Sequence, residues 1–189
     1  MSASTQLCSV SDVKQYLSIS DSAHDALLGA LVDGASEAIE NFCRRRFATE
    51  EYTEYHDGGD SAILLLDHCP AQSVDEVRVD SGHDFENGEP IGEDDYVLYP
   101  EEGLVVRIAG LFSAGARNVR VVYTAGYAAV PDDVNRACVM LAAAWFNRGR
   151  QGADGIAGEK LGDYAANYAS YSLPPQVTGL LTPYLELSI

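Results

Sequence analysis

The side chains best suited to chemistry do not form a recognisable catalytic or metal-binding motif. None of the four histidines stands four residues from another, so no helix carries the paired zinc ligands of an HExxH site. His56, Asp57, His68 and Cys69 could meet at a zinc ion, but adjacent residues of an extended chain point to opposite faces. We therefore interpret these residues as parts of strand ends or turns, and we predict no metal.

A glycine-rich stretch at residues 155–160, Gly-Ile-Ala-Gly-Glu-Lys, is a poor match to a phosphate-binding loop. Such a loop needs glycine directly before the lysine and serine or threonine after it, to hold the phosphates and Mg²⁺. Here Glu159 precedes the lysine and Leu161 follows it. Residues 57–60, Asp-Gly-Gly-Asp, have too few ligands for a calcium loop, and no serine lies in a GxSxG elbow. The sequence therefore predicts neither an enzyme nor a bound cofactor.

Length and composition indicate a globular protein with a sizeable core. Of the 189 residues, 47% are apolar and 22% are charged, which is ordinary for a folded chain. No apolar run approaches the roughly eighteen residues of a membrane span, and residues 1–5 do not look like a signal peptide. We therefore expect no membrane association, and we expect the protein to be made and used in a cytoplasm. The four cysteines are far apart, so we interpret them as reduced, mostly buried thiols.

The net charge limits the possible partners. It is −17, from 29 acidic and 12 basic residues, and only two of the basic residues are lysines. A field of this sign repels nucleic acid, so DNA or RNA binding by a basic patch is not expected. Three interpretations remain: a solvated acidic surface, adaptation to high salt, or a surface past which DNA slides without sticking. Composition alone favours the first.

The helix predicted over residues 131–150 is the element around which the chain is organised. An apolar strand at residues 119–123 leads into it through Pro131, which suits a first helical position because its missing N–H would be unpaired there. Apolar residues then recur at helical spacing and form a stripe that must be buried. We expect the stripe to pack on a second helix, over residues 22–44. The expected contacts between the two helices are Leu28, Leu31, Ala35, Val134, Leu141 and Trp145.

Shorter elements complete the prediction. One helix is expected over residues 11–17, and a last one runs from Pro174-Pro175 to near Pro183. Between residues 47 and 124 the hydrophobic pattern changes from helical spacing to that of five or six short strands separated by glycine-rich turns. An acidic segment at residues 81–95 is expected to be a mobile, exposed loop. Residues 151–162 contain four glycines and are expected to be irregular.

These elements predict an α+β fold, namely a helical bundle of three to four helices with an inserted small antiparallel β-sheet. We divide the chain into N-terminal helices at 1–46 and an inserted β-rich segment at 47–124. A central helix at 125–150 packs on the N-terminal helices, and a flexible arm with a short C-terminal helix occupies 151–189. All four segments are expected to belong to one structural domain.

The order of several short motifs resembles a known family. A helix pair ends in a basic run at residues 44–46, YTAGY at residues 123–127 precedes Val-Pro, and AAAWFNR lies at residues 142–148. GEKLGDY at residues 158–164 and LLTPY at residues 180–184 follow. In this order the motifs resemble the head–tail connector proteins, also called adaptor or head-completion proteins, of long-tailed bacteriophages. The similarity spans nearly the whole chain.

The resemblance implies a structural, non-enzymatic protein of the virion neck, between the capsid portal and the tail. Such connectors assemble as a ring under the portal, with subunits matching its twelvefold symmetry. The implied partners are other copies of the chain, the portal protein and the next neck or tail protein, while DNA passes through the lumen without specific binding. The smallest family members are nearly all helical, so the strand-rich segment is a departure that larger relatives share.

Clustered cations and an aromatic segment are the candidate contacts within such a ring. Closing a ring of chains that each carry a charge of −17 needs local attraction, and the arginine clusters lie at two predicted helix ends. The glycine- and tyrosine-rich segment at 151–171 is expected to order against neighbouring copies. The candidate oligomer or portal contacts are Arg44, Arg45, Arg46, Arg148, Arg150, Tyr164, Tyr168 and Tyr171. Solvated cations at a helix C-terminus are the alternative interpretation of the arginine run.

Other functions remain open at this point. The chain could be another neck or tail-completion protein of the same particle, which binding to purified portal or tail tube would distinguish. A soluble acidic DNA-mimic inhibitor would need carboxylates spaced like phosphates, whereas the acidic residues here cluster in loops. An uncharacterised hydrolase is a third possibility, and it has no supporting motif.

Overall fold

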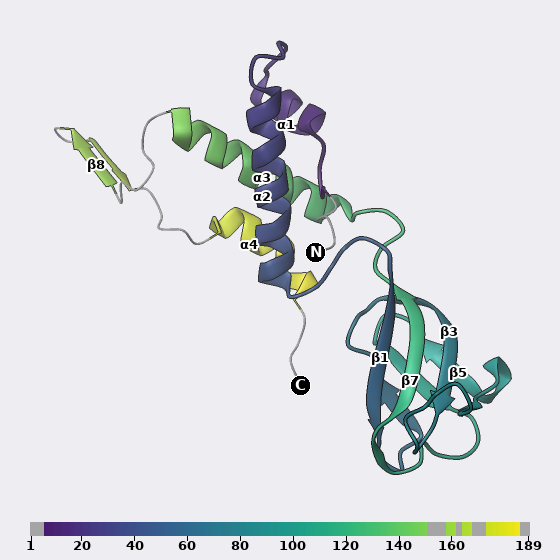
Figure 1. Cartoon of the computed structure of the whole chain (residues 1–189). Coiled ribbons are helices and arrows are strands. Elements are labelled where there is room, and N and C mark those ends of the chain that lie inside the picture. The colour runs from purple at the N-terminus through teal and green to yellow at the C-terminus, as the bar shows by residue number, and fades with distance from the viewer. Residues whose placement is uncertain (1–5, 151–157, 162–163, 168–172, 186–189) are drawn as a thin grey trace. The chain divides into compact units, whose positions relative to one another are not determined.

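The computed structural model describes residues 6–150, 158–161, 164–167 and 173–185. The chain divides into two compact units (Figure 1). We call residues 1–47 with 130–189 the helical unit, and residues 48–129 the strand unit. Each unit is described by itself. The four-segment division within one domain stays a prediction.

The first helix of the helical unit, α1 (Val10–Leu17), begins at a capping box. The Ser9 side chain accepts a hydrogen bond from the Asp12 N–H, and the Asp12 carboxylate accepts one from the Ser9 N–H. Ser18 ends the helix in the left-handed conformation, with φ of +57°. The helix expected over residues 11–17 is therefore confirmed, with its start one residue earlier.

Two longer helices, α2 (Asp25–Cys43) and α3 (Asp132–Arg150), pack against each other and carry most of the core of this unit. α3 also contacts α1 and α4 (Pro175–Leu181), and the short helix η2 (Thr182–Tyr184) follows α4. Of the expected contacts, four are fully buried: Leu28, Ala35, Val134 and Leu141. None of the described helices is long and apolar enough to cross a membrane.

Trp145 lies against α2 as expected, but its neighbour Phe146 is the more deeply buried aromatic residue. Phe146 is the buried aromatic residue of α3, at 2% exposure, and it stacks edge-on against His24. Trp145 and Leu31 are only half-buried. A Cβ atom added at Gly34 would lie 3.4 Å from the Trp145 ring, so the indole packs against this turn of α2.

Buried thiols and a serine link the helices of this unit. The Sγ atoms of Cys8 and Cys138 are 3.1 Å apart, and Ser36 Oγ accepts a hydrogen bond from the Leu7 N–H at 3.0 Å. The hydrogen bond with Cys138, together with burial, raises the pKa of Cys8. All four cysteines are free, and Cys43 is buried as its helical position predicted.

The strand unit is built from two antiparallel sheets that share one core. The four-stranded sheet has the order β1-β7-β3-β4, and its strands are β1 (Glu50–Gly58), β7 (Gly115–Ala125), β3 (Ala71–Val79) and β4 (Glu89–Pro90). The three-stranded sheet has the order β2-β6-β5, and its strands are β2 (Ile63–Leu65), β6 (Leu104–Arg107) and β5 (Tyr96–Tyr99). A short helix, η1 (Glu93–Asp95), leads into β5.

Alternation along the strands decides which residues form this core. On β7, Val119, Val121 and Tyr123 are fully buried, whereas Arg120 and Val122 face outward. Leu64 and Val105 of the other sheet belong to the same cluster. The α+β class is therefore confirmed, and the inserted segment contains two sheets where a single small sheet was expected.

The acidic segment at residues 81–95 is exposed, as expected, but it is not a simple open loop. The Asp80 carboxylate accepts hydrogen bonds from the backbone N–H groups of Gly82, Asp84 and Phe85. The Phe85 and Gly82 amides hold the pKa of Asp80 below its ordinary value. This turn folds Phe85 back onto the sheet, where it is 5% exposed.

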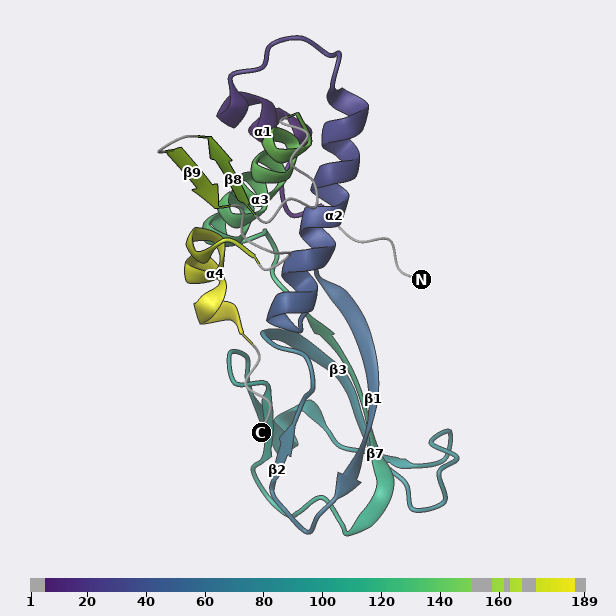
Figure 2. The same ribbon diagram turned by 90° about the vertical axis from the view of Figure 1, so that its left-hand side faces the viewer.

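A second correction concerns residues 151–162, which were expected to be irregular. β8 (Gly158–Leu161) and β9 (Tyr164–Asn167) pair as an antiparallel hairpin, with Leu161 opposite Tyr164 (Figure 2). Gly158 therefore begins a strand, whereas the other three glycines of this stretch lie outside the described residues.

Candidate interaction surfaces

The arginine run after α2 is partly structural. Arg44 caps the helix in the left-handed conformation and is exposed. The Arg46 guanidinium forms an ion pair with Glu40, whose side chain is only 4% exposed. Glu40 also accepts a hydrogen bond from the Phe47 N–H at 3.4 Å. Arg44 and Arg46 are exposed, as expected for solvated cations at a helix end, whereas Arg45 is half-buried. Arg46 is still 43% exposed while it compensates the charge of the buried Glu40 carboxylate.

The other predicted contacts lie at the end of α3 and beyond it. Arg150 is exposed and its Cζ atom lies 5.7 Å from the centre of the Phe146 ring, while Arg148 is half-buried. Tyr164 begins strand β9. Tyr168 and Tyr171 lie outside the described residues. Whether any of these residues contacts another copy or the portal stays a prediction.

Glu54, on the core-facing side of β1, is the centre of a partly buried polar cluster in the strand unit. Its carboxylate accepts hydrogen bonds from the Tyr123 hydroxyl and, at 3.1 Å, from the Asp67 N–H. It also contacts His56 Nε2 at 2.8 Å and His68 Nδ1 at 3.2 Å. The Tyr123 hydroxyl accepts a further hydrogen bond from the His68 N–H at 3.0 Å. Two histidines that sequence analysis considered together therefore meet at one carboxylate.

Hydrogen bonding sets the charge state of this cluster. Burial raises the pKa of Glu54, but the hydrogen bonds from His56, His68, Tyr123 and the Asp67 backbone outweigh it and hold the pKa well below its ordinary value. Burial and the contact with Glu54 raise the pKa of Tyr123. The carboxylate is therefore ionised and the phenol neutral at pH 7.

The same cluster has a donor set that could bind a divalent cation. The ligand atoms of Glu54, His56 and Asp67 lie within 4.8 Å of one another. The Glu54 oxygens already have protein hydrogen-bond donors, so we interpret the cluster as a structural network that joins β1 to the segment after β2. Asp57, considered above as a zinc ligand, instead accepts a hydrogen bond from the Arg117 N–H at 2.6 Å.

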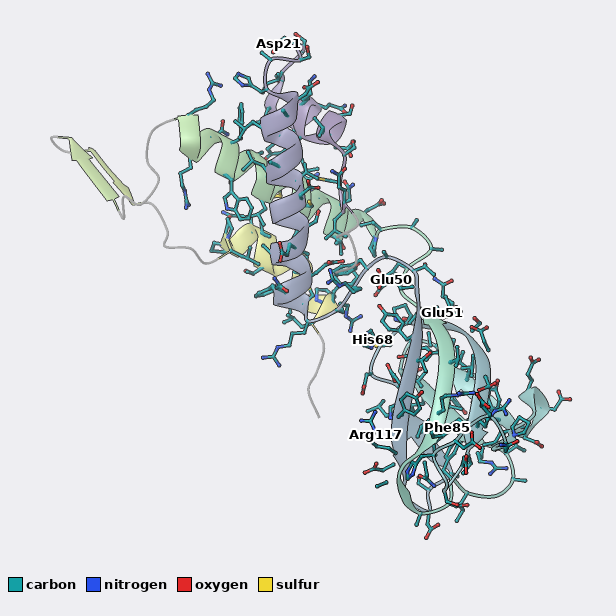
Figure 3. The ribbon with its side chains drawn as sticks, viewed as in Figure 1. Asp21, Glu50, Glu51, His68, Phe85 and Arg117 are labelled. Atoms are coloured by element: carbon teal, nitrogen blue, oxygen red, sulfur yellow. The ribbon has the colours of Figure 1, made fainter. Side chains whose placement is uncertain are left out.

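A cavity of about 570 Å³ opens on the outward-facing side of the four-stranded sheet. Tyr55 of β1 and Arg120 of β7 are opposite each other in the strand register and form part of its floor. The residues that line the cavity are Tyr55, His83, Asp84, Phe85, Ala116, Arg117 and Arg120. Figure 3 labels Phe85 and Arg117 in this part of the strand unit.

Aromatic rings and guanidinium groups alternate in this cavity. The Tyr55 and Phe85 rings are 5.2 Å apart and nearly edge-to-face. Arg120 lies over Phe85 at 5.4 Å, and Arg117 lies over Tyr55 at 5.5 Å, both measured from Cζ to the ring centre. His83 closes one side, with its ring nitrogen 2.8 Å from the Ala116 carbonyl oxygen.

Backbone strain is concentrated at the same place. His83, Phe85 and Arg117 all have positive φ, at +60°, +54° and +48°, although none is glycine. Each such residue costs free energy, and clusters of them are typical of binding sites, where the surrounding structure holds the strained conformation. Arg120 is paired with Glu76 and Asp84 also lines the cavity, so Arg117 is the cation there that a partner's carboxylate could reach.

Sequence reasoning missed this cavity because its residues come from three distant segments. The available signal was Phe85, a lone aromatic residue within an acidic segment. It sits five residues after Asp80, the residue that folds the turn.

Comparisons with known proteins give one family and several structures. Residues 6–187 match the model of the head completion protein family. A chain from the neck of an empty gene transfer agent (GTA) particle, computed with C6 symmetry, is similar with a TM-score of 0.65 and 17% identity. That match covers 100% of this chain and 95% of the other.

Two further structures are similar at 17% identity. A chain from the neck of a native GTA particle, computed with C12 symmetry, has a TM-score of 0.61, and the match covers 95% of this chain and 89% of that one. A chain from the virion of a native GTA particle has a TM-score of 0.62, with 95% and 90% covered. At this identity the likeness establishes a shared fold. No curated protein matches the sequence.

Proposed function

The chain belongs to the head completion protein family, and from that premise we propose that it forms a ring in the neck of a phage-like particle. The ring would sit under the portal, link the DNA-filled capsid to the tail and let DNA pass through its lumen. Its partners would be other copies of the chain, the portal protein and the next neck or tail protein.

The observation that carries this proposal is the extent of the family match. It runs over residues 6–187 and so includes both the helical and the strand unit. The similar chains from GTA particles support the proposal, since two of them come from necks computed with C6 and C12 symmetry. Closed rings of identical subunits are the ordinary result of such symmetry.

The charge of the chain is consistent with a channel through which DNA moves. At a net charge of −17 the surface as a whole repels phosphates. Several arginines are also engaged within the chain: Arg46 pairs with Glu40, and Arg78 and Arg120 pair with Glu76 at 3.0 and 2.5 Å. These three arginines are therefore less available to hold DNA by its backbone.

Binding to purified portal tests this proposal. The full chain is mixed with portal rings and, separately, with tail tubes, and each mixture is measured by native mass spectrometry. We expect a complex of this chain with the portal ring. The number of copies of the chain in it should equal the number of portal subunits or be a divisor of that number. Binding to the tail tube alone would instead favour the alternative of a tail-completion protein, and binding to neither would contradict a neck function.

A further inference from the structure

The outer face of the three-stranded sheet is a continuous apolar surface. It consists of Ile63, Leu65, Val97, Tyr99, Leu104 and Val106, which are direct neighbours in the strand register. Ile63, Val97 and Tyr99 are 54%, 44% and 47% exposed. None of these side chains is charged, although the chain as a whole is strongly acidic. Contiguous exposed apolar surfaces of this kind mark sites where another molecule docks.

The cavity described above lies on the other side of the same unit. The two sheets share one core, so their outer faces point away from each other. Tyr55 and Arg120 belong to the outer face of the four-stranded sheet, and the Phe85 turn folds over them. The strand unit therefore presents an apolar face on one side and an aromatic, cation-flanked cavity on the opposite side.

Arg117 is the cation in this unit that is available to a partner. Residues 48–129 contain four arginines, no lysine and 17 acidic residues, so the formal net charge of the strand unit is −13. Arg78 and Arg120 are held by Glu76, and Arg107 donates to the Leu111 carbonyl oxygen at 3.0 Å. The exposed Arg117 guanidinium forms no ion pair within the described part of the chain and lies over the Tyr55 ring, in a cavity that Asp84 also lines.

A complementary group lies beside the apolar face. Helix η1 (Glu93–Asp95) carries three consecutive exposed acidic residues and leads directly into β5, an edge strand of the three-stranded sheet. The backbone of Asp95 is fixed to this sheet, because its carbonyl oxygen accepts the Ile108 N–H at 2.9 Å. Three exposed carboxylates therefore lie next to the strand that forms one edge of the apolar face.

We propose that strand units of successive copies dock head to tail, with the outer face of the three-stranded sheet of one copy against the Arg117 cavity of the next. The η1 carboxylates of the first copy then reach Arg117 of the second. This inference rests on the proposed ring and names its contact. Because the two docking faces differ, the interface is heterologous, and a heterologous interface closes into a ring when its rotation allows.

Charge favours a second copy of this chain as the occupant. Copies at −17 repel one another over most of their surface, so contact costs least where an uncharged apolar face meets a face that exposes a cation such as Arg117. The strand unit has one face of each kind, on opposite sides. The carboxylates that the cavity accommodates are also abundant on the chain itself, and η1 places three of them next to the apolar face.

Cross-linking in assembled necks tests the contact directly. The substitutions Arg117→Cys and Asp94→Cys are introduced together in the full chain, and purified particles are treated with a bismaleimide. We expect a ladder of covalent multimers from the double variant, because each copy is linked to the next. Each single variant should give no ladder, which also controls for the natural cysteines.

A matched pair on one side of the unit provides the control. Arg117→Cys combined with Thr53→Cys places both thiols on the outward side of the four-stranded sheet, so head-to-tail docking predicts no ladder. Equal laddering of this pair, or no ladder from the Arg117 and Asp94 pair in particles that contain the chain, would overturn the contact. Absence of the wild-type chain from particles would refute the proposed function itself.

Charge reversal gives an independent readout. Arg117→Glu should reduce the assembled fraction about tenfold or more, through loss of a charge-assisted contact, and Asp94→Arg added to it should restore assembly at least in part. Leu65→Asp on the apolar face should reduce assembly as well, whereas Leu27→Asp, at a 51% exposed position on α2, should not. Unchanged assembly of Arg117→Glu and Leu65→Asp would contradict the proposal.

Discussion

Two largely buried carboxylates illustrate how single residues stabilise this acidic chain. Glu40 in the helical unit is neutralised by Arg46, and Glu54 in the strand unit accepts hydrogen bonds from a phenol and a backbone amide and contacts two imidazoles. An ionised group removed from water is tolerated only when such partners replace the lost hydration. The sequence showed the residue types, but the partners come from other segments and could not be assigned from spacing.

The Glu54 cluster predicts a pH-dependent stability. The pKa of Glu54 is below its ordinary value in the folded chain, so its contribution is fully present above about pH 5 and is lost as the pH falls further. We expect Glu54→Gln to lower the free energy of unfolding by about 1–3 kcal/mol at pH 7, and by less at pH 4. Urea unfolding of both proteins at the two pH values measures this. An equal difference at both values would contradict an ionised Glu54.

The arginine run predicts unequal roles for neighbouring side chains. Arg46→Ala leaves the Glu40 carboxylate buried without its cation, so we expect a loss of about 1–3 kcal/mol of unfolding free energy. Arg44→Ala, at an exposed position, is the matched control and should change it by less than about 0.5 kcal/mol, since surface substitutions usually do. Thermal and urea unfolding of the two variants would show the difference, and equal effects would refute the assignment of Arg46.

At the scale of elements, α3 was predictable because several local signals agree. Pro131, Asp132 and Asp133 specify its start, and the apolar stripe specifies its buried face. The position of the aromatic end was not predictable, since Trp145 and Phe146 are adjacent and only packing decides between them. Hairpin β8–β9 was missed because the glycines of residues 151–162 were interpreted as breakers of regular structure.

Packing of α3 predicts different costs for its two adjacent aromatic residues. Phe146 is 2% exposed, so Phe146→Ala should lower the free energy of unfolding by about 3–5 kcal/mol. Trp145 is only half-buried on Gly34, so Trp145→Ala should cost clearly less. Differential scanning calorimetry of the two variants compares them. A larger loss for Trp145→Ala would show that Trp145, and not Phe146, is the main aromatic core residue of α3.

At the scale of the whole molecule, the order of short motifs predicted the family, and the match over residues 6–187 confirms it. The head completion family is structural, which agrees with the lack of a catalytic motif in the sequence. The apolar runs at 62–66 and 104–106 indicated strands, but not that one face of their sheet would remain exposed. Which faces of a strand are covered depends on contacts between sheets and between copies, and one sequence does not encode these as a local pattern.

Imaging of intact particles tests the central claim most directly. Cryo-electron microscopy of the neck, with the chain identified by fitting the helical and strand units separately, would locate it. We predict a closed ring of copies directly under the portal, with the lumen open to DNA and the three-stranded sheet of each strand unit covered by the next copy. A neck in which this position is filled by another protein, or in which the chain lies only at the tail, would contradict the account.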